Sequence, residues 1–225
     1  MDRPLIIFDM DGVLVDVTES YRETIARTIE HFTGAGITRP EIQEYKNRGG
    51  YNDDWKLSHD VITSRGVTVD FKTVVDHFQG IFHGNGTDGL MLRERWIARD
   101  GLFDRLAARF DFAMFTGRLR WEAYATLGRF APALVFDPIV GMEDVLEHKP
   151  SPEGLLKITA QTNDRKVWYI GDTVDDARSA RGAGVPFIGI AAANSPRRVE
   201  LIAVFEAENA AAIIEDINQL ESVLG

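Results

Sequence analysis

Leu5-Ile6-Ile7-Phe8-Asp9-Met10-Asp11-Gly12 is the stretch that decides the fold of this chain. Its four consecutive apolar residues predict a strand that is buried on both faces, as in a parallel sheet. Asp9 and Asp11 follow at positions i and i+2 and share a face of an extended segment, so both carboxylates are expected to point at one substrate. Ligands in open parallel sheets bind beyond the carboxyl ends of the strands, although an ordinary acidic turn is the alternative.

Composition limits the classes of protein to consider. The chain has 225 residues, 44% of them hydrophobic and 27% charged, which is typical of a soluble globular protein with one large or two smaller domains. A net charge of −10 argues against nucleic acid as a partner. The absence of cysteine excludes disulfides, zinc–thiolate sites and thiol nucleophiles.

The location and assembly follow from the apolar segments. No stretch approaches the roughly 18 apolar residues of a membrane span, and the first apolar run is too short for a signal peptide. We therefore predict a cytoplasmic protein that binds neither membrane nor nucleic acid. Both a monomer and a homodimer are compatible with the sequence.

Residues 16–86 predict an all-helical insertion. Apolar residues recur at helical spacing over 18–34, 40–45, 53–64 and 71–82. Lys46-Asn47-Arg48-Gly49-Gly50-Tyr51 is predicted to form a basic, glycine-containing loop, and the segment 83–89 a turn-rich return. The predicted organisation is a core formed by 1–15 and 87–225 with a helical cap formed by 16–86.

Short apolar runs alternate with helical patterns over the rest of the chain. The predicted strands are 112–115, 134–137, 167–170 and 187–190, and the predicted helices are 102–109, 121–128, 152–158 and 177–183. Apolar residues between 213 and 224 have helical spacing and are expected to pack on the core. This alternation predicts an α/β fold with a Rossmann-like parallel sheet flanked by helices.

Polar residues lie where several of these predicted strands end or in the loop that follows one of them. They are Asp9, Asp11, Thr116, Lys149 and Asp172. The carboxyl ends of parallel strands meet at one edge of a sheet, so these side chains are expected to gather there. Packing does not require such a cluster, whereas a phosphate ester and a divalent cation would.

These residues closely resemble the motifs of the haloacid dehalogenase superfamily, in particular its members with a helical C1-type cap. Within it, the chain is most similar to the phosphatase branch that contains phosphoglycolate phosphatase and β-phosphoglucomutase-like proteins. The four motifs are Asp9–Leu14, Thr116, Lys149 and Gly171–Asp176, in the family's order and at compatible spacing. The resemblance covers almost the whole chain.

The resemblance implies a reaction in two displacements. Asp9 would attack phosphorus and form an aspartyl phosphate. Asp11 would protonate the departing alcohol and then take a proton from the attacking water. Thr116, with Gly117 beside it, would bind the phosphoryl group, and Lys149 would neutralise charge on the phosphate and the nucleophile.

The resemblance also implies a magnesium site. Asp172 and Asp176 would hold Mg²⁺, with Asp9 and the carbonyl of Asp11 completing the shell, because Mg²⁺ prefers oxygen ligands. The family's usual spacing selects Asp176 as the second carboxylate of the last motif. Asp175 is the competing candidate, or else a helix N-cap.

The local residues sort the chemistries found in this superfamily. Dehalogenases and phosphonate-cleaving members lack the second aspartate of the first motif, so Asp11 argues against both. The predicted function is therefore a Mg²⁺-dependent phosphomonoester hydrolase acting on a small phosphorylated metabolite. A sugar-phosphate mutase and a catalytically silent binding or regulatory module are the alternatives.

Lys46 and Arg48, in the predicted basic loop, are candidate contacts for an anionic or hydroxyl-rich leaving group, with an ordinary solvated turn as the alternative.

Overall fold

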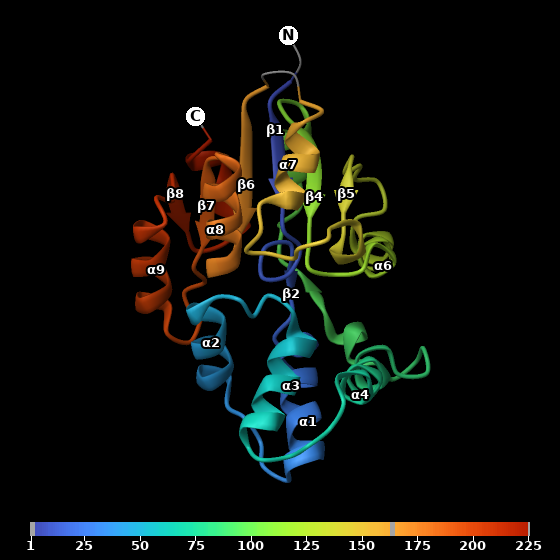
Figure 1. The fold of residues 1–225 in the computed structure, drawn as a ribbon. Helices are drawn as coiled ribbons and strands as arrows, with labels where there is room; N and C mark the ends of the chain where they lie inside the picture. Colours follow the sequence, from blue (N-terminus) through green and yellow to red (C-terminus); the bar gives the residue numbers. More distant parts are fainter. Residues whose placement is uncertain (1–2, 163–164, 225) are drawn as a thin grey trace.

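A six-stranded parallel sheet forms the centre of the computed structural model, which describes residues 3–162 and 165–224 (Figure 1). The strand order is β5-β4-β1-β6-β7-β8, and each neighbouring pair is parallel. The strands are β1 Leu5–Phe8, β4 Asp111–Phe115, β5 Ile139–Val140, β6 Val167–Gly171, β7 Phe187–Ile190 and β8 Ala212–Ile214. The predicted α/β fold with a parallel sheet is confirmed, and β1 lies between β4 and β6 near the middle of the sheet.

Alternate residues of β1 enter two different apolar clusters, one on each face of the sheet. Ile6 and Phe8 pack in one cluster, and Leu5 and Ile7 pack in the other. The first cluster includes residues of α5 Leu102–Ala107, α6 Arg120–Phe130 and the short helix η3 Ile217–Ser222. The second includes residues of α7 Glu153–Thr159, α8 Val174–Ala183 and α9 Arg198–Ala207. Burial of β1 on both faces explains its run of four apolar residues.

Four of the helices between β1 and β4 lie beyond the carboxyl end of the sheet (Figure 1). They are α1 Tyr21–Thr33, α2 Arg39–Arg48, α3 Asp54–Ser64 and α4 Phe71–His83. An antiparallel ribbon of β2 Val15–Asp16 and β3 Arg95–Trp96 carries the chain out of the core and back. No helix among the described residues has both the length and the apolar character that a bilayer span requires.

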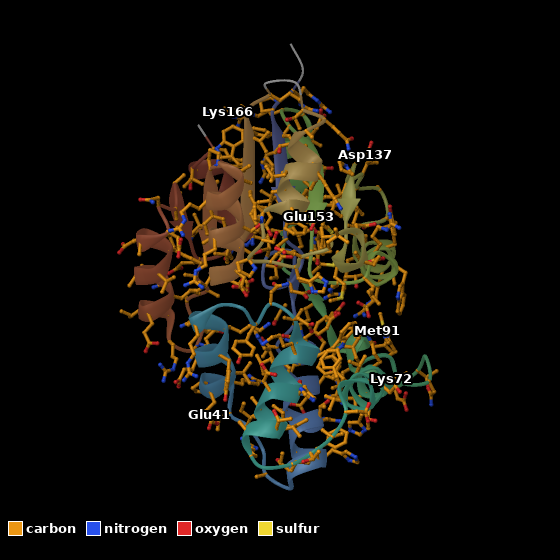
Figure 2. All side chains as sticks on the ribbon, in the orientation of Figure 1. Glu41, Lys72, Met91, Asp137, Glu153 and Lys166 are labelled. Carbon is orange, nitrogen blue, oxygen red and sulfur yellow. The ribbon has the colours of Figure 1, made fainter. Side chains whose placement is uncertain are left out.

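The return to the core passes through a short helix that packs with the insertion. This helix, η1 Leu90–Arg93, carries Met91 (Figure 2) and contacts α1 and α4. A 3₁₀ helix η2, Met142–Asp144, follows β5 on the core side. We propose the β2–β3 ribbon as the boundary of the cap, which assigns η1 to the cap rather than to the core.

Two predicted elements of the core are wrong in whole or in part. Residues 134–137 do not form a strand: Val135 is 74% exposed, and Phe136 is buried with its ring centroid 5.9 Å from that of Phe8. The strand comes later, as β5, although the Asp137 amide already donates to the carbonyl of Phe112 at 2.8 Å and the carbonyl of Pro138 accepts the Met114 amide at 2.9 Å.

The predicted helical stripe over 213–224 is wrong for its first residues, since β8 pairs with β7 there, whereas η3 follows and Ile217, Leu220 and Leu224 pack on the core as predicted. The pattern between β7 and β8 does not predict α9, of which only Leu201 and Phe205 are buried.

The predicted loop over 46–51 is wrong at its start. Helix α2 continues through Arg48 and ends at Gly49, whose φ of +81° few other residues adopt. Thr38 and Glu41 form a capping box at the other end of the helix. Lys46 and Arg48 therefore lie on the last turn of a helix, and they point to different surroundings.

Candidate active site

Asp9 and Asp11 lie in the turn that follows β1, and Gly12 makes that turn possible. Gly12 has a φ of +71°, and a Cβ at this position would lie 1.9 Å from Oδ2 of Asp172. The Asp9 amide donates to the carbonyl of Ile170 at 2.8 Å, which continues the β1–β6 ladder by one residue. A side chain at position 12 would therefore disturb both the turn and the acidic group opposite.

Asp9, Asp172 and Asp176 form an acidic cluster at the carboxyl end of the sheet. One carboxylate oxygen of each lies within 4.8 Å of the others. Burial raises the pKa of Asp9 to about 7, and Asp176 and Asp11 add to the rise while Lys149 opposes it. Burial also raises the pKa of Asp172 well above its usual range, with further contributions from Asp176 and Asp9. The negative charges of Asp9 and Asp172 are therefore disfavoured unless a cation joins them, whereas Lys149 and hydrogen bonds from Thr173 and Tyr169 outweigh burial and lower the pKa of Asp176.

The residues of the cluster fit a hard divalent cation. Asp172 is half-buried, and the charge of Arg22 only partly offsets the effects of burial, Asp176 and Asp9 that raise its pKa. Asp176, in contrast, is held firmly: its Oδ2 accepts the Thr173 amide at 3.0 Å and the Thr173 hydroxyl at 2.6 Å. Carboxylate oxygens are the ligands that Mg²⁺ prefers, so the cluster could hold such an ion.

Lys149 forms ion pairs with two members of this cluster. Its Nζ lies 3.0 Å from Oδ1 of Asp9 and 2.8 Å from Oδ1 of Asp176, and the residue is 4% exposed. Burial alone would lower the pKa of Lys149, but Asp176 and Asp9 together raise it. The ammonium group therefore stays charged and partly neutralises the carboxylates around it.

Thr116 and Gly117 follow β4 at the same edge of the sheet. Thr116 is buried, and its hydroxyl accepts the amide N–H of Arg118 at 3.2 Å, which leaves the hydroxyl proton to be donated elsewhere. Gly117 lines the cavity at the site, and a Cβ there would lie 2.5 Å from the side-chain nitrogen of Asn52. The glycine thus allows the cap to approach the core closely.

Asp175 points away from the acidic cluster and binds the cap. Its carboxylate accepts three consecutive backbone N–H groups, from Gly50 at 2.7 Å, Tyr51 at 3.1 Å and Asn52 at 2.9 Å. The residue is 2% exposed. Asp176, and not Asp175, is therefore the member of the last motif that the fold brings to Asp9 and Asp172.

Asp175→Asn is expected to weaken the closed arrangement of cap and core, because an amide group replaces one acceptor oxygen by a donor. Charged hydrogen bonds of this kind contribute about 1.5–3 kcal/mol, so we expect KM for a substrate to rise roughly 10- to 100-fold. Hydrogen exchange of the amides of residues 50–52 should accelerate. Asp70→Asn, which alters an exposed helix cap within the cap domain, is the control. Unchanged exchange at residues 50–52 would contradict this role for Asp175.

Lys46 reaches the site and Arg48 does not. Lys46 is 6% exposed, pairs with Asp54 and lines the cavity next to Asp9. Arg48 pairs with Glu44 on the surface of α2 and is not part of the cavity wall. Of the two predicted substrate contacts in the cap, the structure brings only Lys46 to the predicted catalytic residues.

The cavity between cap and core is small. It has a volume of about 50 Å³ and is lined by Asp9, Asp11 and Asp172 from the core and by Lys46 and other residues from the cap. A cavity of roughly 10–15 Å³ on this measure holds one water molecule, so the space fits a few waters. A second cavity of about 570 Å³ also borders Asp172. Asp9 and Asp11 line the smaller cavity and not the larger one, so the insertion covers the predicted catalytic residues closely in this structure.

Arg118 is a residue of the site that sequence reasoning missed. It is 1% exposed, and it forms ion pairs with Asp11 and Glu94. An arginine after a strand is ordinarily read as a surface residue. The available signal was its position two residues beyond Thr116, at the same sheet edge.

The fold and the site together define an α/β protein with an acidic centre at the carboxyl edge of its sheet, enclosed by a helical insertion. A family model described as haloacid dehalogenase-like hydrolase matches residues 6–190. A haloacid dehalogenase-like hydrolase from Bacteroides fragilis has a solved structure that superposes with a TM-score of 0.77 at 24% identity, covering 97% of this chain and 100% of that one. The chain belongs to the haloacid dehalogenase-like hydrolase family, as predicted.

Two curated relatives add sequence similarity. Phosphoglycolate phosphatase from Cereibacter sphaeroides is 26% identical over 186 residues, which are 82% of this chain and 83% of that protein. Imidazoleglycerol-phosphate dehydratase from Phytophthora nicotianae is 31% identical over 194 residues, which are 82% of this chain. The match covers only 42% of the length of the Phytophthora protein.

Proposed function

We propose that this protein is a Mg²⁺-dependent phosphomonoester hydrolase that acts on a small phosphorylated metabolite through an aspartyl-phosphate intermediate. The observation that carries the proposal is the position of Asp9, which lies in an acidic cluster with Asp172 and Asp176 and pairs with Lys149 at 3.0 Å. The family match and the relative named phosphoglycolate phosphatase support a phosphatase.

The first displacement transfers the phosphoryl group to the protein. An oxygen of Asp9 forms a bond to phosphorus as the bond between phosphorus and the leaving oxygen breaks. Asp11, in its acid form, gives its proton to the departing alkoxide. The Thr116 hydroxyl donates to a phosphoryl oxygen, and Lys149 offsets the negative charge on Asp9 and on the phosphate.

The second displacement releases phosphate. Asp11, now ionised, takes a proton from a water molecule that attacks phosphorus, and the bond from phosphorus to Asp9 breaks. Both residues thereby return to their starting states. Mg²⁺, held by Asp9, Asp172 and Asp176 and by the carbonyl of Asp11, would supply charge neutralisation at the phosphoryl oxygens when bound.

The enclosed site supports small substrates. The cavity that Asp9, Asp11 and Asp172 line together with Lys46 of the insertion has a volume of only about 50 Å³. A cap that closes over the reacting group excludes water and disfavours a folded protein as substrate. The cytoplasmic location and the choice between monomer and homodimer stay predictions.

The test of the proposed function is phosphate release from p-nitrophenyl phosphate and from a panel of small phosphorylated metabolites in the presence of Mg²⁺. Turnover is expected for p-nitrophenyl phosphate and for at least one metabolite. Conversion of a sugar phosphate to its isomer without phosphate release would instead indicate a mutase. Binding without either reaction would indicate a catalytically silent module.

Lys46→Met is expected to raise KM about tenfold for an anionic substrate such as 2-phosphoglycolate, because it removes a cation from the cavity wall; kcat should change less than threefold. A tenfold change in affinity corresponds to about 1.4 kcal/mol. Arg48→Met is the matched control and should leave KM unchanged, since Arg48 pairs with Glu44 outside the cavity. Equal KM values for the two variants would show that Lys46 serves only its ion pair with Asp54.

A further inference from the structure

Arg118 is a buried cation of the site that the proposed reaction does not yet use. Its Nε donates to Oδ1 of Asp11 at 2.8 Å, and one Nη2 proton is directed to the same oxygen. The other Nη2 proton goes to Glu94 at 2.7 Å, and Nη1 donates to Thr126 at 2.9 Å. The guanidinium carbon also lies 5.0 Å from the ring centroid of Tyr21.

This arrangement leaves Arg118 little capacity to bind a substrate directly. A guanidinium has five N–H donors, and the bonds to Asp11, Glu94 and Thr126 use four of them. Glu94 is also buried, at 3% exposure, so the ion pair between Arg118 and Glu94 is shielded from solvent. An arginine that bound phosphate would present its planar fork to the cavity, whereas this fork is turned to protein carboxylates.

The hydrogen bonds from Arg118 orient the carboxyl group of Asp11. Two donors on one oxygen fix both the position and the plane of its carboxyl group. Both donors go to Oδ1, so Oδ2 is the oxygen left for proton transfer. Proton transfer requires heavy atoms about 2.6–3.2 Å apart, and a misplacement of 1 Å can reduce a rate about 100-fold.

We propose that Arg118 is a positioning residue that holds the carboxyl group of Asp11 in the orientation needed to protonate the leaving alcohol. This inference rests on the proposed function and assigns a role to a residue outside the four motifs. Glu94 supports it by anchoring the guanidinium from the segment that returns from the cap to the core.

A series of leaving groups tests this role. The leaving group of p-nitrophenyl phosphate, p-nitrophenolate, is a stable anion that departs without a proton. The leaving group of benzyl phosphate is a strongly basic alkoxide, so its departure depends on proton donation by a general acid. The value of kcat/KM reports the steps up to loss of the alcohol. The ratio of kcat/KM for benzyl phosphate to kcat/KM for p-nitrophenyl phosphate, measured on one preparation, does not depend on the fraction of folded protein.

Arg118→Lys keeps the charge but cannot bridge Asp11 and Glu94 as a planar fork. We expect it to lower the ratio about tenfold or more, in the same direction as Asp11→Asn, for which general acid catalysis predicts a fall of about 100-fold or more. Combining the two substitutions should lower the ratio no further than Asp11→Asn alone, because both act on one proton transfer.

Arg129→Lys is the control for a structural effect. Arg129 donates to the carbonyls of Met91, Leu92 and Glu94, so it supports the same returning segment without contacting Asp11. The ratio of kcat/KM for benzyl phosphate to kcat/KM for p-nitrophenyl phosphate should be the same in Arg129→Lys as in the wild type. A uniform loss in Arg118→Lys with an unchanged ratio, while Asp11→Asn lowers the ratio, would overturn this inference and leave the proposed function standing. Absence of any turnover by the wild type would overturn the proposed function itself.

Discussion

Asp9→Asn is expected to reduce kcat for p-nitrophenyl phosphate by at least about 10⁴-fold, because it replaces the nucleophile by an amide. Removal of a nucleophile in a hydrolase that forms a covalent intermediate has an effect of this order or larger. The substitution keeps the size of the side chain, so the turn at Gly12 and the packing against β6 should remain. A melting temperature within a few degrees of that of the wild type would show that the loss is chemical.

The covalent step can be observed directly. Wild-type protein quenched in acid during turnover should carry a phosphate group on the peptide that contains Asp9, and the Asp9→Asn variant should carry none. Asp137→Asn is the matched control, since Asp137 is exposed (Figure 2) and lies outside the site. Robust turnover by Asp9→Asn, or a phosphate group on a different residue, would refute the assignment of the nucleophile.

The part of this site that could be predicted from the sequence is the part that follows from sheet topology. Strands β1, β4 and β6 pair in parallel, so the residues just beyond them must share an edge. That single constraint brings Asp9, Thr116 and Asp172 together without any knowledge of side-chain packing. The helices of the insertion were predictable for a different reason, because capping residues and glycines mark the ends of a helix locally in the sequence.

The parts that could not be predicted depend on contacts between distant segments. The burial of Arg118 depends on its ion pair with Glu94, which is 24 residues away in the chain and lies in the segment that returns from the insertion to the core. Residues 213–224 have helical spacing, but the first of them pair with β7 and form strand β8. Lys46 and Arg48 are two positions apart on one helix, and helical geometry points them in different directions.

Removal of divalent metal by EDTA is expected to reduce turnover by on the order of 10³-fold, and Mg²⁺ should restore it. Charge stabilisation of a transition state by a metal contributes several kcal/mol, and each 1.36 kcal/mol corresponds to a factor of ten in rate. Full activity in EDTA would contradict the proposed role of the acidic cluster. Because Asp9 belongs to both the cluster and the reaction, a readout other than activity is needed to assign the metal site.

Thermal unfolding provides that readout through Asp172. Mg²⁺ at 100 times its dissociation constant should stabilise the wild type by about 2.7 kcal/mol, which is roughly 5–10 °C for a chain of this size. Asp172→Asn should abolish this shift, whereas Asp137→Asn should retain it.

In EDTA at neutral pH, Asp172→Asn should melt above the wild type. The raised pKa of Asp172 means that the folded state disfavours its charge, so wild-type stability falls as pH rises from the pKa of the unfolded chain toward the raised folded value. An asparagine carries no such charge. The carboxylate of Asp172 should therefore destabilise the protein without metal and stabilise it with metal. If Asp172→Asn lost activity but did not melt above the wild type in EDTA and below it in Mg²⁺, the metal site would have to lie elsewhere.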